Sequence, residues 1–359
     1  MDMDKLTSTL AREIGRDAKQ VANVITLLEG GATIPFIARY RKELHGSMDD
    51  QLLRQLCDRL QYLRNLEGRK EEIRRAIENQ GKLTDELSQA IENAATLAEA
   101  EDLYRPYKQK RRTRATIARE KGLEPLAQLL FAQKRSGPAP AEAARDYSGP
   151  EKGVETVEDA LQGASDIIAE WLSDDAAIRK TLRELVLRQG SLHSAAATQE
   201  DSVYRLYYDF TFPLRRLQGY QVLAINRGER ENMLKVSVQL DRPNALAALC
   251  RAVVRPGTPA MAFVKAAAED AYDRLIFPSL EREVRALLKE KADEGAIHTF
   301  ALNLRPLLMQ PPVKGKVTMG LDPGYRMGCK VAVVDATGKV LDTRVVYPTH
   351  GPRQKEECI

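Results

Sequence analysis

Cysteine and histidine are scarce in this chain of 359 residues, and their spacing is not that of a metal centre. None of the four cysteines, Cys57, Cys250, Cys329 and Cys358, belongs to a C-x-x-C pair, and the four histidines stand at unrelated spacings. We therefore expect no zinc site, no other metal and no cofactor. Isolated thiols in a chain of this size are typical of a reducing, cytoplasmic environment.

Long apolar runs are also missing. No stretch approaches the ~20 apolar residues that a membrane span requires. The first residues, MDMDKLTSTLAREIGRD, lack the apolar core of a secretory signal. We therefore expect a cytoplasmic protein without membrane contact. No repeat of fixed period is visible either, which argues against a solenoid.

Aromatic residues make up only 6% of the chain, whereas hydrophobic residues make up 43% and charged residues 30%. Such a composition is typical of amphipathic helices with solvated faces. The length predicts about two to three domains. The net charge of +4 says little by itself, because spread charge mainly maintains solubility. Clusters of charge are more informative.

Helical spacing of apolar residues dominates the first 312 positions. Leucines at three- and four-residue steps predict a long helix over residues 49–80, which Gly81 ends and after which Thr84 opens another. In TIPFIARYRKEL, one helical face is formed by Phe36, Ile37, Tyr40 and Leu44, and the cations lie largely off it. The sole tryptophan, Trp171, is expected to pack in a core.

These patterns divide the chain into a helical region over residues 1–135, a Gly/Pro/Ala-rich linker over 136–150 and a second helical region over 151–312. MLKVSVQL alternates, so the second region should contain a short β segment near 220–240. Only after Val317 do several strand-like runs follow one another, VTMGLD, CKVAVVD and KVLDTRVVY, with DATG as a turn. The predicted fold is mainly α, with the opening of a sheet at the C-terminal end.

A dense basic segment occupies residues 104–119, which contain seven lysines and arginines and no acid. Pro106 and the charge density predict a loop or turn over residues 105–112, with helix resuming near Thr116. Such a cluster attracts phosphates through counterion release, and Tyr104 and Tyr107 could stack on bases. The candidate nucleic-acid-binding residues are Arg105, Lys108, Lys110, Arg111, Arg112 and Arg114. The alternative is a solvated loop whose cations pair with some of the 51 acids of the chain.

A helix-turn-helix spacing follows the basic segment. In IAREKGLEPLA, the A-x-x-x-G-L pattern is matched by Ala118, Gly122 and Leu123. A small residue lets two helices approach, and glycine permits the backbone of the turn.

Asp322 ends the first predicted strand of the C-terminal region, where RNase H-like nucleases carry their first metal-binding carboxylate. Those nucleases hold two metals about 4 Å apart with several carboxylates. Asp335 belongs to the predicted hairpin turn, and Asp342, Glu356 and Glu357 follow too closely to lie on a fourth strand. Asp322 is therefore at most a vestigial metal-site position. The same D-x-G hairpin opens actin-like ATPases, which need a second phosphate loop.

Several long segments resemble the Tex family of bacterial RNA-binding transcription accessory proteins, those of Gram-positive bacteria most. They run in the family's order: IPFIARYRKE, QGKLT, EDLYRPYKQKRRTRATIA, LAINRGERE, FPSLERE, FALNLRPLLMQPPVKG and LDPGYRMGCKVAVVDATGKV. The resemblance implies a helical N-terminal region with helix-turn-helix character, followed by a YqgF domain of RNase H-like fold. The chain departs from the family at Met327, where relatives usually have threonine, and at Gly219-Tyr220, which replace Ser-His.

In the family, helix-hairpin-helix motifs and an RNA-binding OB-fold domain follow the YqgF domain, whereas residues 315–359 match only its beginning. The resemblance implies a nucleic-acid-binding transcription accessory factor that is not an enzyme in this part. One alternative is a metal-dependent RNase H-like nuclease acting through Asp322. The other is a protein-interaction scaffold that contacts RNA polymerase or ribosome-associated proteins without touching RNA or DNA.

Overall fold

The chain is mainly helical, as predicted. The structure is a computed structural model that describes residues 3–149, 153–311, 315–324 and 327–348. Its packing divides into two units, Met1–Leu288 and Lys289–Ile359. Within the described residues, no helix is both long enough and apolar enough to cross a bilayer.

The N-terminal helices are organised by one long helix. These elements are α1 (Met3–Ile14), α2 (Ala18–Glu29), α3 (Ile34–Tyr40), α4 (Lys42–His45), α5 (Asp50–Glu78), α6 (Asp85–Asn93) and α7 (Leu97–Tyr104). The carboxylate of Asp49 caps α5 by accepting a hydrogen bond from the backbone N–H of Leu52 at 2.7 Å. One end of the leucine stripe of α5 packs against α1, α2 and α3, and the other end packs against α6 and α7. The long helix predicted over residues 49–80 is thus confirmed.

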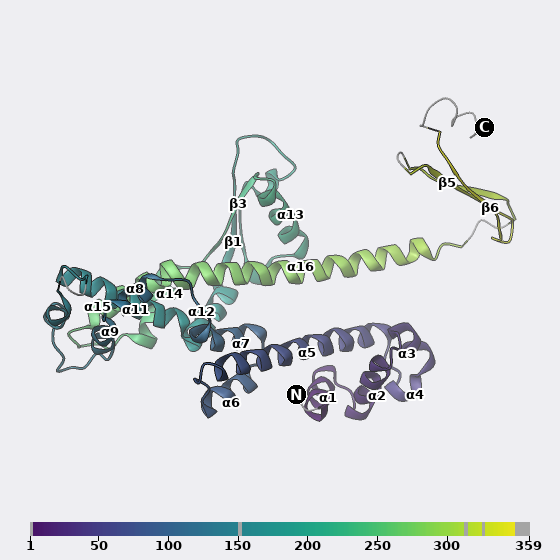
Figure 1. The fold of residues 1–359 in the computed structure, drawn as a ribbon. Helices are drawn as coiled ribbons and strands as arrows, with labels where there is room; N and C mark the ends of the chain where they lie inside the picture. The colour runs from purple at the N-terminus through teal and green to yellow at the C-terminus, as the bar shows by residue number, and fades with distance from the viewer. Residues whose placement is uncertain (1–2, 150–152, 312–314, 325–326, 349–359) are drawn as a thin grey trace. The chain divides into compact units, whose positions relative to one another are not determined.

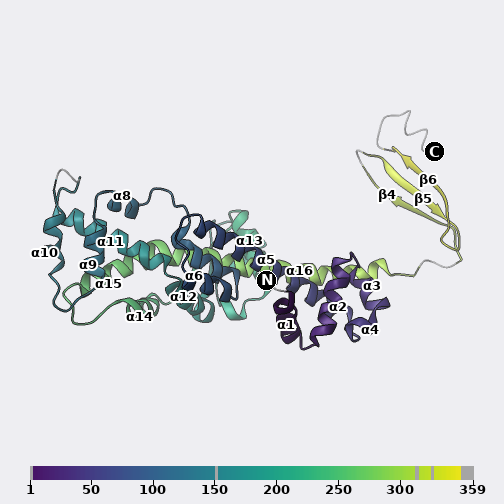
Figure 2. The ribbon, with the colours of Figure 1, turned by 60° about the horizontal axis from the view of Figure 1, so that its bottom comes forward.

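A second helical layer surrounds α11. Its elements are η1 (Arg105–Tyr107), α8 (Arg114–Glu120), α9 (Glu124–Phe131), α10 (Pro140–Ala144), α11 (Val157–Asp174), α12 (Ala176–Gln189), α14 (Arg242–Val253), α15 (Met261–Asp270), the π-helical η6 (Ala271–Ile276) and α16 (Phe277–Leu308). Figures 1 and 2 both show α8, α9 and α15 beside α11. Alanines along α11 allow this close approach, and Trp171 packs against Phe131 with ring centroids 5.8 Å apart.

Within residues 136–150, expected to be a linker, the described residues 140–147 contribute to the packing instead. They contain α10 and η2 (Arg145–Tyr147), and the buried Ala143 and Ala144 belong to the same core as α9 and α11. The proline and alanine residues that suggested a linker have a structural role instead. Pro140 starts a short helix, and small side chains let that helix pack closely.

A small antiparallel sheet interrupts the helices. Its strands β1 (Ser191–Ala196), β2 (Asp209–Pro213) and β3 (Leu234–Gln239) are arranged in the order β2-β1-β3, with Leu192 opposite Val238. Helix α13 (Gly219–Arg230) packs against β3. The predicted alternation of MLKVSVQL is confirmed in β3. The expected β segment near 220–240 is thus partly helical, and β1 and β2 were not predicted.

A buried ion cluster joins three helices of the first unit. Asp102 on α7 accepts a hydrogen bond from Nε of Arg179 on α12 at 2.5 Å and pairs also with Arg183. Both arginines also pair with Glu283 on α16. The side chains of Asp102 and Arg179 are only 5% and 2% exposed, so neither charge has water to compensate it. The cluster therefore depends on all of its members being present.

The second unit holds a meander of three strands, β4 (Thr318–Asp322), β5 (Cys329–Val334) and β6 (Val340–Val346), in the order β4-β5-β6. The turn between β5 and β6 is built by Asp335, whose carboxylate accepts hydrogen bonds from the backbone N–H groups of Thr337 at 2.8 Å and Lys339 at 3.0 Å. These three strands and the turn after β5 agree with the sheet opening that the sequence predicted.

Removing Asp102 should strongly destabilise the first unit. In Asp102→Ala, the buried guanidinium of Arg179 loses its closest carboxylate, which we expect to cost about 3–5 kcal/mol of unfolding free energy. Urea unfolding followed by circular dichroism measures the change. The control is Arg54→Ala, which removes an exposed pair with Asp50 and should cost less than about 0.5 kcal/mol. Equal losses in the two variants would contradict a structural role for the cluster.

Candidate nucleic-acid interface

The basic segment folds as a short 3-10 turn, an extended stretch and then a helix. Pro106 lies in the first turn of η1, and the hydroxyl of Thr113 caps α8 by accepting from the backbone N–H of Thr116 at 3.1 Å. The loop or turn predicted over residues 105–112 is confirmed. Helix α8 begins at Arg114, two positions before the predicted start.

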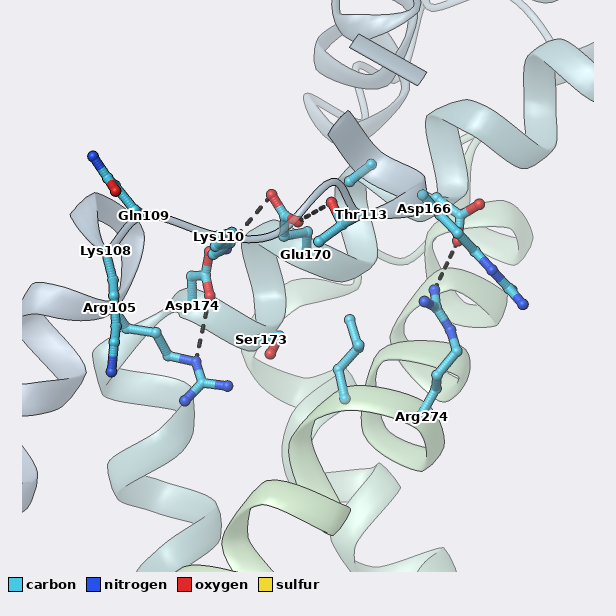
Figure 3. Close-up of a pocket in the computed structure, with 13 residues that line it drawn as sticks. Arg105, Lys108, Gln109, Lys110, Thr113, Asp166, Glu170, Ser173, Asp174 and Arg274 are labelled. Carbon is cyan, nitrogen blue, oxygen red and sulfur yellow. Dashed lines mark hydrogen bonds and ion pairs between the residues drawn. The ribbon is translucent and has the colours of Figure 1, made fainter. Parts of the chain in front are cut away.

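A row of acids on α11 faces this segment. Asp166, Glu170 and Asp174 are spaced four residues apart and thus lie on one helical face. Their side chains are only 8%, 11% and 13% exposed. Figure 3 shows Asp174 directed toward Arg105, and Glu170 directed toward Lys110 and Thr113.

These acids fix two of the six predicted phosphate-binding residues. Lys110 pairs with Asp174 and lies 3.5 Å from Glu170, and Nε of Arg105 lies 3.4 Å from Asp174. Burial lowers the pKa of Arg105 from its ordinary value, and the charge of nearby Arg179 adds to the effect. Burial also raises the pKa of Asp174, which Lys110 only partly offsets.

Glu170 is the most strongly partnered member of the row. It accepts hydrogen bonds from Arg119 at 2.8 Å and from the hydroxyl of Thr113 at 2.9 Å. Burial alone would raise its pKa, but the hydrogen bonds from Arg119 and Thr113 and the charge of Lys110 hold the pKa below its ordinary value. Glu170 therefore stays ionised and anchors the extended stretch at Lys110 and at its end, Thr113.

Within the described residues, the other four predicted phosphate-binding residues comprise one that is ion-paired and three that are not. Arg112 pairs with Glu120 at 2.7 Å on the surface. By contrast, Lys108, Arg111 and Arg114 are exposed and form no ion pair with any residue that the structure describes. Ion pairing thus separates three of the six predicted residues from three that remain available to a ligand.

A pocket of about 340 Å³ opens beneath the segment. Lys108 and Arg114 contribute to its lining, and the three acids of α11 contribute carboxylates. Arg274, in the π-helical η6, closes another side and donates to Asp166 at 2.7 Å, as Figure 3 shows. The pocket therefore carries charges of both signs.

The two tyrosines of the segment are engaged elsewhere. Tyr104 and Tyr107 pack against the core formed by α5, α6 and α7. The guanidinium of Arg69 lies 5.7 Å from the ring centroid of Tyr104, and Gln80 donates to the backbone carbonyl of Tyr107 at 2.9 Å. These contacts give both rings a structural role and weaken the expectation that they stack on bases.

The helix-turn-helix spacing corresponds to two short helices joined at Gly122, whose φ is 76°. Ala118 and Leu123 are buried, as the pattern requires. The second helix, α9, carries no lysine or arginine and buries Leu126, Ala127 and Leu130. Helix α9 therefore lacks the cations that a DNA-reading helix would present to phosphates.

Asp322 lies at the end of β4, opposite Lys330 on β5. In the described part of the chain, no group of three or more histidine, cysteine or acidic side chains is placed to hold a metal ion. The hydrogen bonds from Thr337 and Lys339 lower the pKa of Asp335. Glu356 and Glu357, also considered as partners for Asp322, lie outside the described residues.

Family models match three stretches of the chain in sequence order. The Tex-like protein N-terminal domain matches residues 4–78, the Tex central region-like model matches 136–300, and the Tex protein YqgF-like domain matches 316–359. The chain belongs to the Tex family. The resemblance seen in the sequence is thereby confirmed.

Individual Tex relatives align along nearly the whole chain. "Uncharacterized protein YdcI" of Bacillus subtilis is 47% identical over 355 residues, which are 98% of this chain and 49% of that protein. "Protein tex" of Bordetella pertussis is 41% identical over 376 residues, covering 100% and 47%. "Transcriptional accessory protein Tex" of Neisseria gonorrhoeae is 40% identical over 352 residues, covering 95% and 46%. The chain thus spans about half the length of these relatives.

Gly163 should prove essential for holding α8 and α9 on α11. A methyl group at this position would collide with Leu123 and lie 3.2 Å from Ala118. We expect Gly163→Ala to lower the unfolding free energy by about 1–3 kcal/mol. The matched control is Gly68→Ala on α5, where nothing lies within 4 Å, and this change should stabilise by about 0.5–1 kcal/mol. Thermal unfolding of both variants measures the difference, and a stabilised Gly163→Ala would contradict the close packing.

Proposed function

We propose that this part of the Tex chain binds nucleic acid through phosphate contacts and catalyses no reaction itself. The main support is that the cations of the basic segment divide into ion-paired and unpaired residues. Lys108, Arg111 and Arg114 are exposed and unpaired within the described residues, whereas largely buried acids fix Arg105 and Lys110, and Arg112 forms a surface pair with Glu120. The fixed cations position the segment, and the unpaired ones contact the ligand.

Phosphate is the ligand chemistry that this arrangement favours. Exposed lysine and arginine side chains contact the nucleic-acid backbone without reading its sequence. Such contacts serve RNA and DNA alike, because both carry the same phosphate charge. Binding should therefore depend strongly on salt and weakly on sequence.

A role in transcription is supported by sequence similarity to a named relative. One relative bears the name "Transcriptional accessory protein Tex", and it is 40% identical to this chain. The chain covers about half of such relatives, and we propose that it shares their accessory role in transcription. A cytoplasmic location is part of it too, and the isolated thiols support this location.

Neutralising the three unpaired cations should weaken binding to single-stranded RNA and to duplex DNA together. In the variant Lys108→Ala, Arg111→Ala and Arg114→Ala, we expect more than a tenfold loss of affinity at low salt. The log–log salt slope on single strands should fall by about 2, because each lost phosphate contact removes roughly 0.7. Fluorescence anisotropy with labelled oligonucleotides at several salt concentrations measures both quantities.

The control for net charge is Lys235→Ala, Lys265→Ala and Lys291→Ala, which removes three other exposed cations. Its affinity and salt slope should stay close to those of the unchanged chain. If both triple variants lost the same affinity, overall charge rather than the basic segment would explain binding. If neither lost affinity, the basic segment would not be the phosphate contact, and the assignment of Lys108, Arg111 and Arg114 would be overturned.

The nuclease alternative makes a separate prediction. A metal nuclease acting through Asp322 would cleave RNA or DNA with Mg²⁺ or Mn²⁺ and lose this activity in Asp322→Asn. We expect no cleavage by either protein in gel assays with both metals. Metal-dependent cleavage that disappears in Asp322→Asn would overturn the non-catalytic assignment.

A further inference from the structure

Helix α3 is held firmly by its inner side. Ile37 is fully buried in the core formed by α1, α2 and α5. The ring of His45 is also fully buried, and its Nε2 lies 3.1 Å from the carbonyl oxygen of Ile37. The outward side of α3 is therefore a fixed surface. Figure 1 shows α3 and α4 at one end of α5.

Two aromatic rings occupy that outward side. Phe36 is 39% exposed and Tyr40 is 57% exposed, although the sequence placed both on one face with Ile37 and Leu44. Their ring centroids are 5.4 Å apart, with an interplanar angle of 45°. Exposed aromatic pairs on a fixed helix offer faces on which a planar group can stack.

Cations accompany these rings. The guanidinium of Arg41 lies 5.2 Å from the ring centroid of Phe36, and its Nη1 donates to the backbone carbonyl of Tyr40 at 3.1 Å. Arg39 and Lys42 are exposed. Neither they nor Arg41 forms an ion pair with any residue in the described ranges.

The exposed residues Phe36, Arg39, Tyr40 and Lys42 and the half-buried Arg41, here named the α3 platform, carry a net positive charge. Between Thr33 and His45 the only acid is Glu43. An anionic partner with planar groups complements both features. Single-stranded nucleic acid is such a partner, because its unpaired bases stack on aromatic rings while its phosphates meet cations.

We propose that the α3 platform is a binding site for single-stranded nucleic acid. Phe36 and Tyr40 stack on unpaired bases, and Arg39, Arg41 and Lys42 contact the neighbouring phosphates. This inference rests on the proposed nucleic-acid-binding function and adds a preference to it. The basic segment, whose tyrosines pack against the core of α5, α6 and α7, holds any phosphate backbone, whereas the α3 platform requires bases that are free of a duplex.

The test compares single-stranded and duplex ligands. In Phe36→Ala combined with Tyr40→Ala, the affinity of the full chain for labelled single-stranded RNA should fall about tenfold, the loss expected for one or two stacked bases. The affinity for duplex DNA should change less than twofold, and the salt slope on single strands should stay the same. Fluorescence anisotropy measures all three quantities.

Two further variants keep the test specific. Tyr220→Ala removes another exposed aromatic side chain, 69% exposed, and should leave both affinities unchanged. Tyr40→Trp retains an aromatic face and should keep most of the single-strand affinity. Circular dichroism checks that each variant is folded.

The outcomes separate the α3 platform from the basic segment. Unchanged single-strand affinity in the double variant, while the Lys108, Arg111 and Arg114 variant weakens binding, would overturn the platform and leave the proposed function standing. Equal losses on single strands and duplexes would also overturn it, because base stacking would not explain them. If the unchanged chain bound neither ligand, the platform and the proposed function would fall together.

Discussion

The pairing of the basic segment with the acids of α11 determines which cations of the segment can reach a ligand. Glu170 and Asp174 are largely buried, so each must have a positive partner to remain ionised at low cost. Lys110, Arg105 and Arg119 provide these partners and thereby fix the course of the chain from η1 to α8. The remaining cations, Lys108, Arg111 and Arg114, are exposed to solvent.

A second set of buried charges supports this arrangement. Asp102 lies on α7, directly before the basic segment, and is paired with Arg179 and Arg183 on α12. Glu283 connects both arginines to α16. The start of the segment is thus tied to α12 and α16, while its middle is tied to α11. Buried ion pairs add little net stability, but they penalise any packing that separates the partners.

Local patterns predicted much of the fold. The leucine steps of α5 and the alternation of β3 each need only neighbouring residues, and both were confirmed. The strand β1 was missed because SLHSAA carries only one large apolar side chain, and β2 was missed because the alternation of DFTFP spans only five residues and ends in proline. Helix α10 was missed because proline and small residues are common to linkers and to closely packed short helices.

The site was harder to predict, because its partners are distant in sequence. The clustered charge identified the basic segment, but the acid that holds Lys110 lies 64 positions further along the chain. No local sequence pattern shows which cation will form an ion pair with such a distant acid. Helical periodicity likewise placed Phe36 and Tyr40 with Ile37, yet only Ile37 is buried. Exposure of two aromatic rings depends on which helices cover α3, and this requires the whole fold.

The salt dependence of nucleic-acid binding by the unchanged chain shows whether its unpaired cations contact phosphate. Labelled single-stranded RNA is titrated with residues 1–359 at salt concentrations from about 50 to 200 mM. We expect measurable affinity at low salt and a log–log slope of about −2 or steeper, which corresponds to three or more phosphate contacts. No binding at the lowest salt, or binding that salt does not weaken, would contradict the assignment of the unpaired cations to phosphate.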